Sequence, residues 1–458
     1  MNSPQIKRLK FQTIACTNEP KRLISSALCA NPPKANHSTK KRLMNTYLLI
    51  VLGAIIGEYL IQSTVRILNL RSLKPNLPEE FAGFYDANEY RRSQEYTRVN
   101  SNFAFVSSTI STLAICAFIL LGGFNEIDEL VRGPGFSPLV TGLLFFAVLF
   151  ILSDILSLPF SLYGNFVIEE KFGFNRLTIK TFVIDKIKSY VLVAILGGCF
   201  MGAILYFFEQ LGEDAWLYAW GIFTAFIVIM PPLFTSFIAP LFNKFEPLEE
   251  GTLKESLAAY AQKVNFPLTG VFVMDGSKRS TKSNAYFSGF GKKKRIVLFD
   301  TLIQEHSSEE LVAILAHEIG HYQKKHIIKG VILSVLQMGV LFFLLSKFLN
   351  NPELFEAFKM SHTSVYASLV FFSLLYSPIS FVLSIVQNII SRFHEYEADE
   401  FSASTVGNHE ALISGLKRLA VNNLGNLTPH KFSVFLNHSH PTVLQRIARL
   451  RNRSSSVA

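Results

Sequence analysis

Seven apolar stretches, each long enough to cross a lipid bilayer as an α-helix, constrain this chain more than any other feature. A bilayer holds no water to satisfy free backbone groups, so a spanning segment must be a helix or a strand of a closed barrel. The last four stretches contain no Asp, Glu, Lys or Arg. The stretches lie at about residues 46–66, 103–123, 139–163, 190–208, 215–242, 330–346 and 365–390. The sequence therefore predicts an all-α, multi-pass membrane protein with about seven transmembrane helices.

The composition supports this fold class and narrows the partners. Hydrophobic residues make up 49% of the 458 residues and charged residues only 17%, against about 25% charged in typical soluble domains. The four cysteines are scattered, with no spacing typical of a disulfide framework or a thiolate metal site, so any metal must be held by His and carboxylate. The net charge of +10 comes without an aromatic-basic RNA motif. We therefore expect the lipid bilayer, and no nucleic acid, as a partner.

The charges of the loops predict an orientation. Segments 71–102, 164–189 and 243–329 carry most of the Lys and Arg, which places them in the cytosol. Seven spans then put the N-terminus on the opposite side. Residues 1–43 contradict this, because they are rich in Lys, Arg and Ser, with Glu19 as the only acid. Two explanations are consistent with the pattern: a processed or disordered targeting extension, or a miscounted first span.

Residues 317–321 read His-Glu-Ile-Gly-His and follow the helix-favouring run 312–316. On a helix, His317 and His321 project from the same face, because residues four apart are neighbours there. Two neutral imidazoles at that separation can hold one Zn²⁺, and Glu318 between them can act as a base on a water that the metal activates. The alternative is a surface helix that happens to carry two His and one Glu.

A zinc hydrolase needs a third protein ligand and one open position. The sixth and seventh apolar stretches form a hairpin that returns the chain to the same membrane face, and Glu395 is the first acid after that return. Asp399 follows one helical turn later and can accept a hydrogen bond from a ligand imidazole. Spacing alone leaves Glu397 and Glu400 as equally plausible third ligands.

Two further sites are candidates for binding substrate. The stretch 437–441, Asn-His-Ser-His-Pro, offers a donor to the oxyanion that develops during peptide hydrolysis. The commoner reading of a His pair before Pro is a loop leading into a helix. Asn284 precedes an apolar strand at 296–299 and could hold the peptide backbone, since peptides often add to an exposed strand edge. Asn284 as a plain turn residue is the alternative.

These patterns divide the chain into five parts. The basic extension covers 1–43, transmembrane helices one to five lie in 44–242, and a small mixed α/β metalloprotease segment covers 243–329. Transmembrane helices six and seven lie in 330–390, and the C-terminal helical segment 391–458 completes the metal site. Within the metalloprotease segment we expect one helix and two strands, at 251–264, 270–275 and 295–299.

In combination these motifs resemble those of the type I CAAX prenyl proteases, which are integral-membrane zinc metalloendopeptidases. The resemblance runs from about residue 44 to 450 and includes the metal motif. A lone His-Glu-x-x-His would be unspecific, but many blocks in the same order are highly specific. The other blocks lie at 166–175, 238–245, 275–287, 294–302, Glu395-x-x-x-Asp399 and Ser439-His440-Pro441. The basic extension at 1–43 is not a usual feature of the family.

The resemblance implies a fold and an activity. Seven transmembrane helices would enclose a water-filled chamber, with one zinc ion per chain near the cytosolic side of the endoplasmic reticulum membrane. The substrates would be isoprenylated CAAX-motif proteins, from which the enzyme removes the last three residues. The resemblance assigns zinc binding to His317, His321 and Glu395, catalysis to Glu318 with Asp399 as supporting acid, and substrate or transition-state binding to His440 and Asn284.

Two other functions share some of these features. A membrane quality-control metalloprotease would have the Glu-x-x-x-Asp pattern but fewer spans. A transporter or receptor with a structural metal would have a closed coordination sphere and ionisable residues spread through its spans. Four spans without charge and an open His₂Glu site favour the protease.

Overall fold

Seven long apolar helices dominate the computed structural model, which describes residues 45–288 and 294–457. The predicted basic extension at 1–43 lies outside the described residues. Four spans are single helices: α1 (Thr46–Arg71), α2 (Ala87–Leu121), α12 (His326–Phe348) and α14 (Val365–Val406). The other three contain a π-helical segment: α4 (Pro138–Tyr163) with η2 (Gly164–Glu169); α5 (Ile179–Leu192), η3 (Val193–Gly197) and α6 (Gly198–Leu211); and α7 (Trp216–Leu233), η5 (Phe234–Ile238) and α8 (Ala239–Phe242). The predicted number of spans and the all-α membrane class are confirmed.

The apolar side chains of these helices face outward. In the most apolar window of each span, between 6% and 22% of the residues are buried inside the protein. Leu60, Leu113 and Leu121 are 56%, 64% and 81% exposed. Soluble proteins do not expose contiguous apolar surface on this scale. The helices therefore need lipid around them, and the chain is a multi-pass membrane protein.

Local signals set where the long helices begin and end. The Asp86 carboxylate accepts hydrogen bonds from two backbone N–H groups of the first turn of α2, and the helix stops at Gly122, which has a left-handed φ of 80°. α14 begins at the Ser364 cap and ends at Gly407, also left-handed. Between these caps α14 runs unbroken for 42 residues, so the seventh span and the segment carrying Glu395 are one helix. The sequence had predicted a span ending at residue 390.

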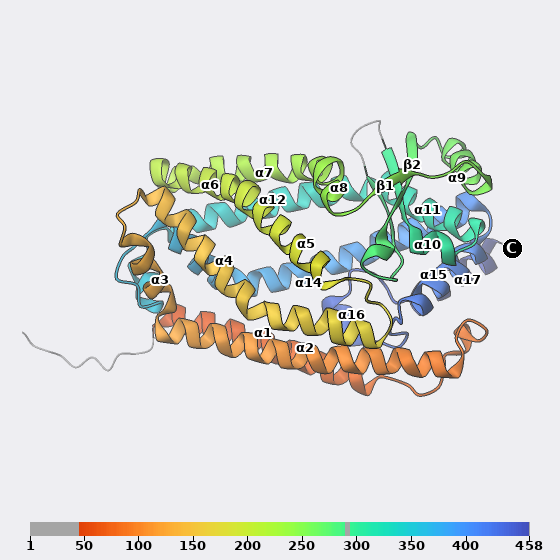
Figure 1. Ribbon diagram of the computed structural model, residues 1–458, viewed down its shortest axis with the longest axis horizontal. Helices are drawn as coiled ribbons and strands as arrows, with labels where there is room; N and C mark the ends of the chain where they lie inside the picture. The colour runs from red at the N-terminus through yellow and green to blue at the C-terminus, as the bar shows by residue number, and fades with distance from the viewer. Residues whose placement is uncertain (1–44, 289–293, 458) are drawn as a thin grey trace, which may run out of the picture. The chain divides into compact units, whose positions relative to one another are not determined.

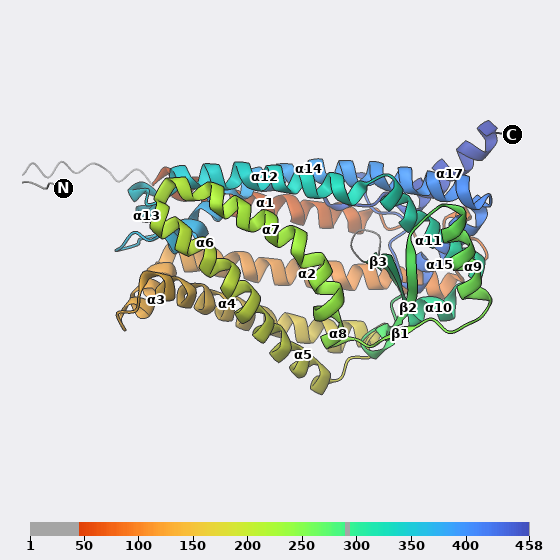
Figure 2. The ribbon, with the colours of Figure 1, turned by 90° about the horizontal axis from the view of Figure 1, so that it is seen from above.

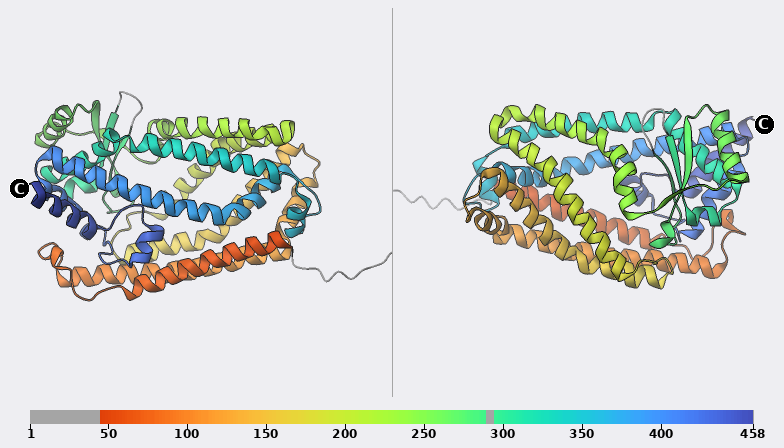
Figure 3. Two further views of the ribbon diagram at one scale, coloured as in Figure 1. Left: turned by 180° about the vertical axis from the view of Figure 1, so that it is seen from behind. Right: turned by 45° about the horizontal axis from the view of Figure 1, so that its top comes forward.

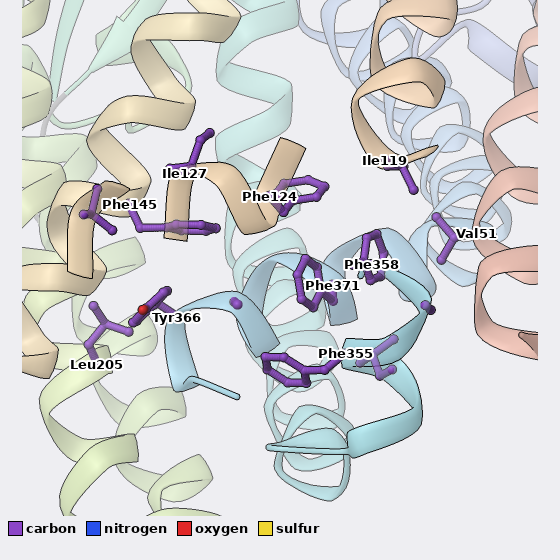
Figure 4. Packing of buried hydrophobic residues seen from close by; sticks show 14 residues of the cluster. Val51, Ile119, Phe124, Ile127, Phe145, Leu205, Phe355, Phe358, Tyr366 and Phe371 are labelled. Carbon is purple, nitrogen blue, oxygen red and sulfur yellow. The ribbon is translucent and has the colours of Figure 1, made fainter. Parts of the chain in front are cut away.

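An aromatic cluster closes the end of the bundle that carries the short helices α3 (Gly123–Arg132) and α13 (Pro352–Ala357) (Figure 2). Figure 4 shows its side chains converging from α1, α2, α3, α4, α6, α13 and α14. The Phe358 and Phe371 rings stack with centroids 3.9 Å apart, and Phe124 meets Phe371 edge-on at 5.3 Å. Aromatic pairs of this kind add about 0.5–1.5 kcal/mol beyond their burial. This cluster holds the helices together at the end away from the sheet.

A small mixed sheet lies at the other end of the bundle, in the order β1-β2-β4-β3 (Figure 1). β2 and β4 are parallel, whereas β1 and β3 are antiparallel to their neighbours. The strands are β1 (Phe245–Pro247), β2 (Leu268–Met274), β3 (Ala285–Ser288) and β4 (Lys294–Phe299). The helices around them are α9 (Thr252–Lys263), α10 (Asp300–Glu305), α11 (Ser308–Gln323), α15 (His409–Asn422), α16 (Lys431–Asn437) and α17 (Val443–Val457). The predicted helix and both predicted strands are present, within a few residues.

The basic segments predicted to share one membrane face meet at this sheet end, as Figures 1 and 3 show. Ser72 Oγ donates to the Thr428 carbonyl at 2.9 Å, and Arg176 N–H donates to the Arg279 carbonyl at 3.0 Å. The loops after the first and third spans therefore contact the C-terminal segment and the metalloprotease segment, respectively. The remaining short turns are η1 (Glu79–Phe81), η4 (Gly212–Ala215) and η6 (Gly276–Lys278).

Candidate active site

Helix α11, which carries the His-Glu-Ile-Gly-His motif, is anchored at its first turn. Ser307 and Glu310 form a capping box: the Ser307 hydroxyl accepts from Glu310 N–H, and the Glu310 carboxylate accepts from Ser307 N–H at 3.0 Å. The same buried carboxylate accepts hydrogen bonds from Arg418 at 3.1 Å and Ser414 at 2.5 Å, both on α15. One side chain thus starts α11 and attaches it to α15.

Small residues bring α11 and α14 into close contact. A Cβ added at Gly320 would lie 2.9 Å from the Ala398 Cα atom and 3.1 Å from its carbonyl oxygen. One turn away from this contact, the Ser402 hydroxyl donates to the Ala313 carbonyl at 2.8 Å. Close backbone approach through small residues is typical of helices packed in membrane proteins. It puts the two histidines of α11 within reach of the Glu395 carboxylate on α14.

Three ligand atoms converge at this contact. His317 Nε2 lies 3.2 Å from His321 Nε2, Glu395 Oε1 lies 3.3 Å from His321 Nε2, and Glu395 Oε2 lies 3.5 Å from His317 Nε2. A tetrahedral ion with bonds of about 2.0–2.1 Å holds its ligands about 3.3–3.4 Å apart. The Glu395 Oε2 atom is also buried and accepts no hydrogen bond among the described residues. The residues present therefore fit a divalent metal ion.

The structure shows which of the three candidate carboxylates lies beside the two histidines, a choice that sequence spacing left open. Glu395 is buried in the triangle, whereas the Glu397 carboxylate is half exposed and accepts a hydrogen bond from His326 at 2.8 Å. Glu400 is not part of the converging group. Of the alternatives, Glu395 is the residue whose oxygens meet the two imidazoles.

Asp399 and Arg446 support the His317 ring from behind. Asp399 Oδ1 lies 2.9 Å from His317 Nδ1, and Arg446 donates to both Asp399 oxygens at 2.5 and 2.8 Å. All three side chains are buried. An acceptor at Nδ1 keeps the proton on that nitrogen and leaves Nε2 free to bind a metal. Asp399 therefore contacts a metal-binding ring and not the triangle itself.

The electrostatics of this group affect metal binding. Burial and the Arg446 charge oppose protonation of His317, but the nearby carboxylates of Asp399 and Glu395 outweigh them and raise its pKa to about 9. Burial by itself would lower the pKa of Arg446, yet the charge and hydrogen bonds of Asp399 raise it. Because a ligand imidazole must be neutral, a metal ion would compete with a proton for the His317 ring.

One cavity of about 460 Å³ joins the other candidate residues to the triangle. Glu318, Asn284 and His440 all line it, together with the two histidines and Glu395. His440 sits on the loop between α16 and α17, and its Nε2 lies 3.3 Å from Glu395 Oε1. The Ser439 hydroxyl contacts His440 Nδ1 at 2.9 Å. The structure therefore brings together the seven residues to which the family resemblance assigns a role, and leaves out the alternative ligands Glu397 and Glu400.

Strand β3 forms a wall of this cavity. Asn284, Ala285 and Tyr286 line it, and among the described strands β3 pairs only with β4, so its other edge is free. The Asn284 side-chain oxygen accepts a hydrogen bond from the backbone N–H of the next residue, Ala285, at 2.8 Å. The Asn284 backbone oxygen accepts one from the Phe299 N–H at 3.1 Å. An extended peptide can add to such an edge by backbone hydrogen bonds.

Sequence reasoning missed Arg446 and the packing role of Gly320. Arg446 lies in α17 with Arg449 and Arg451, and this spacing suggests an ordinary basic, solvent-facing helix. Gly320 could have been found, because a glycine inside a helix usually has a packing or functional reason. Two histidines on one helix, a carboxylate on a membrane helix and an acid beside them in the same cavity define an integral-membrane metallopeptidase.

Comparison with known proteins agrees with this class. The family model for the CAAX prenyl protease N-terminal region, with five membrane helices, matches residues 66–244, and that of peptidase family M48 matches residues 247–454. The CAAX prenyl protease 1 homolog of Oryza sativa is 36% identical over 89% of this chain and 98% of its own length. The human homolog is 33% identical over 90% of this chain and 96% of its own length.

A solved structure extends the similarity to the fold. The crystal structure of S. mikatae Ste24p superimposes with a TM-score of 0.82 at 32% identity and covers 88% of this chain and 99% of that one. The chain belongs to the CAAX prenyl protease 1 family within peptidase family M48. It is a membrane metalloendopeptidase.

Proposed function

We propose that this chain is a zinc endopeptidase that removes the C-terminal tripeptide from isoprenylated CAAX-motif proteins. The observation that carries the proposal is the triangle of His317, His321 and Glu395, beside Glu318, in a cavity at the end of a seven-helix membrane bundle. The relatives named CAAX prenyl protease 1 support the substrate class. We propose one zinc ion per chain, held by this triangle.

We propose zinc as the metal because of the set of ligands. Two imidazole nitrogens and one carboxylate oxygen, with a fourth position open, are the ligands of a catalytic zinc in thermolysin-like hydrolases. When bound, the ion supplies Lewis-acid chemistry: it lowers the pKa of a water molecule and polarises a peptide carbonyl.

The chain's own residues carry the proton transfers. Glu318 takes a proton from the attacking water and passes it to the leaving amine. His440 donates from Nε2 to the oxyanion of the cleaved carbonyl, with Nδ1 held by the Ser439 hydroxyl. Asp399, itself held by Arg446, keeps the His317 proton on Nδ1.

The free edge of β3 supports peptide binding. A substrate chain in extended form would pair with Ala285 and Tyr286 and pass Asn284, whose amide can donate to a substrate carbonyl. This arrangement would bring the scissile bond to the metal triangle, since β3 and the triangle line the same cavity.

The membrane bundle supports a lipid-modified substrate. Burial of each CH₂ of a prenyl chain contributes about 0.8 kcal/mol, so the lipid partitions into the bilayer and brings its peptide with it. A water-filled chamber among the seven helices, opening at the interface, would receive both parts. The basic segments gathered at the site end support a cytosolic active site. The endoplasmic reticulum membrane is the location that we propose.

The test is a matched pair of peptides that end in a CAAX motif, one farnesylated and one not, with the purified chain in detergent or liposomes. We expect cleavage between the modified cysteine and the next residue, detected by mass spectrometry, and much faster cleavage of the farnesylated peptide. Equal rates for both peptides would contradict the substrate class and favour a quality-control protease.

A further inference from the structure

A second hydrogen-bonded chain leads away from the metal triangle on the side of His321. His321 Nδ1 lies 3.0 Å from His326 Nδ1, and His326 Nε2 lies 2.8 Å from Glu397 Oε2. His326 is buried, with 5% of its surface exposed, whereas the Glu397 side chain is 47% exposed. The chain therefore runs from a metal-facing ring, through a buried imidazole, to a carboxylate at the protein surface.

The backbone is shaped for this contact. In a continuous helix, side chains five residues apart point about 140° away from each other. Between His321 and His326 the helix is interrupted: α11 ends at Gln323, and Lys325 adopts a left-handed φ of 58°, which non-glycine residues rarely take. α12 then begins at His326 in a new direction. This break returns the His326 ring to His321.

The proton positions in the series His321, His326 and Glu397 can be assigned one after the other, starting from His321. If His321 binds a metal through Nε2, its neutral ring carries the proton on Nδ1. That proton points at His326 Nδ1, which must then be unprotonated and act as the acceptor. The His326 proton is therefore on Nε2, from which it is donated to Glu397. A single arrangement of neutral rings satisfies all three contacts.

We propose that His326 and Glu397 are positioning residues that fix the tautomer and the orientation of His321 as a metal ligand. This proposal rests on the metal-binding role proposed above for His321. The two imidazoles of the site are then supported differently. His317 has a carboxylate in direct contact, backed by Arg446, whereas His321 reaches its carboxylate through a second imidazole.

The same residues raise the question of a second metal ion, because ligand atoms of His326, His394 and Glu397 lie within 4.8 Å of one another. A metal on His326 Nε2 would move the His326 proton to Nδ1. Two N–H groups, on His321 and His326, would then face each other across 3.0 Å. Occupation of the second position thus opposes occupation of the first. His394 instead stacks on His326, with ring centroids 3.9 Å apart and planes at 11°, which holds the ring in place.

The experiment measures Zn²⁺ affinity of the full-length chain in detergent by competition with a chelator, alongside the unfolding midpoint of each metal-free variant. His326→Phe keeps a ring against His394 but removes the acceptor, and we expect a 10–100-fold weaker affinity, the usual effect of losing such a partner. His326→Gln restores an acceptor and should recover most of the affinity. A structural role alone would not give this recovery. Wild-type affinity in His326→Phe would overturn the proposal.

Substitutions of Glu397, whose side chain is 47% exposed, provide an independent test. Glu397→Gln still accepts from His326 and should bind zinc nearly as the wild type does, whereas Glu397→Leu should bind more weakly. Equal affinity of Glu397→Leu and Glu397→Gln would contradict a role for a hydrogen-bond acceptor at position 397.

His394→Phe is the matched control. It preserves the ring stack but removes a ligand of the alternative second site, so we expect one zinc ion per chain and unchanged affinity. Two ions in the wild type that fall to one in His394→Phe would overturn the proposal and assign a second metal site. A wild-type chain that binds no zinc would instead refute the proposed function, which keeps the two failures distinct.

Discussion

At the scale of single residues, the proposed mechanism assigns metal binding and proton transfer to two neighbours in the sequence. His317 and Glu318 are adjacent, yet only His317 contributes to the converging ligand atoms, while Glu318 lines the cavity. On a helix, consecutive side chains point about 100° apart, so one can face the ion and the next the substrate. Each role can therefore be removed without the other.

Glu318→Gln tests this separation. The amide cannot accept the water proton, so we expect cleavage to fall by about 10²–10⁴-fold while metal content stays at the wild-type level. Glu309→Gln, on the exposed first turn of the same helix, should leave both unchanged. Metal analysis and peptide cleavage on the same preparation measure both quantities, and full turnover in Glu318→Gln would remove this residue from the mechanism.

A buried histidine outside the metal site predicts how stability varies with pH. His306 lies at the end of α10 with its Nδ1 3.2 Å from the Leu302 carbonyl, and burial lowers its pKa below the ordinary value of 6.5. Below pH 6.5 the unfolded chain therefore binds a proton that the folded protein resists, and stability falls as the pH falls.

We expect the wild-type unfolding midpoint to decrease between pH 7 and pH 5, and His306→Gln to decrease less. Gln retains a donor for the Leu302 carbonyl. The exposed His362→Gln should follow the wild type. Thermal unfolding in detergent across this range provides the measurement, and identical pH profiles for wild type and His306→Gln would contradict it.

At the scale of elements, the site depends on how closely two helices approach. α11 supplies both histidines and α14 supplies the carboxylate, and Gly320 packs directly against the Ala398 backbone. A glycine inside a helix costs about 1 kcal/mol relative to alanine. Its presence here is explained by the contact, since any side chain would push α11 away from α14 and open the triangle.

A comparison of the variants Gly320→Ala and Gly330→Ala isolates this packing effect. Overpacking at Gly320 should cost about 1–3 kcal/mol, more than the gain in helix propensity, and should weaken metal affinity as well. A Cβ at Gly330, in α12, meets no atom within 4 Å, so Gly330→Ala should match or exceed the wild-type midpoint. Unfolding midpoints and chelator competition measure both effects, and a stabilised Gly320→Ala with normal affinity would show that the contact can relax.

At the scale of the whole molecule, a bound metal would join parts of the chain that are distant in sequence. The ligands come from α11 in the segment between the fifth and sixth spans and from α14, the seventh span. Anything that binds only the folded state stabilises it, by about 2.7 kcal/mol at a hundredfold excess over its Kd. The bundle itself is held separately, by the aromatic cluster at its other end.

We therefore expect a chelator to lower the unfolding midpoint without unfolding the protein at room temperature, and added zinc to restore it. Glu395→Gln should have a lower midpoint that responds little to chelator. Thermal unfolding in detergent with and without chelator tests this, and a wild-type midpoint insensitive to chelator and zinc would mean that the metal is not bound across these helices.

The membrane fold and the metal motif were predictable because both are local. A run of apolar residues determines a span wherever it occurs, and the i, i+4 spacing of His317 and His321 places both rings on one face of any helix. Capping signals such as Ser307 with Glu310 are also contained in a few residues. All seven helices and the histidine pair could therefore be located from the sequence.

The rest was decided by packing between distant segments. Sequence alone determined that the chain spans a membrane and carries two histidines on one helix face, since each depends on a few consecutive residues. Only the tertiary structure selected Glu395 over Glu397, aimed Arg446 at Asp399 and returned His326 to His321. Arg446 and Asp399 are 47 positions apart in the sequence, and Glu395 and His321 are 74 apart. The contact between His326 and His321 needs a break in a helix. No local pattern encodes such contacts, because they depend on where whole helices pack.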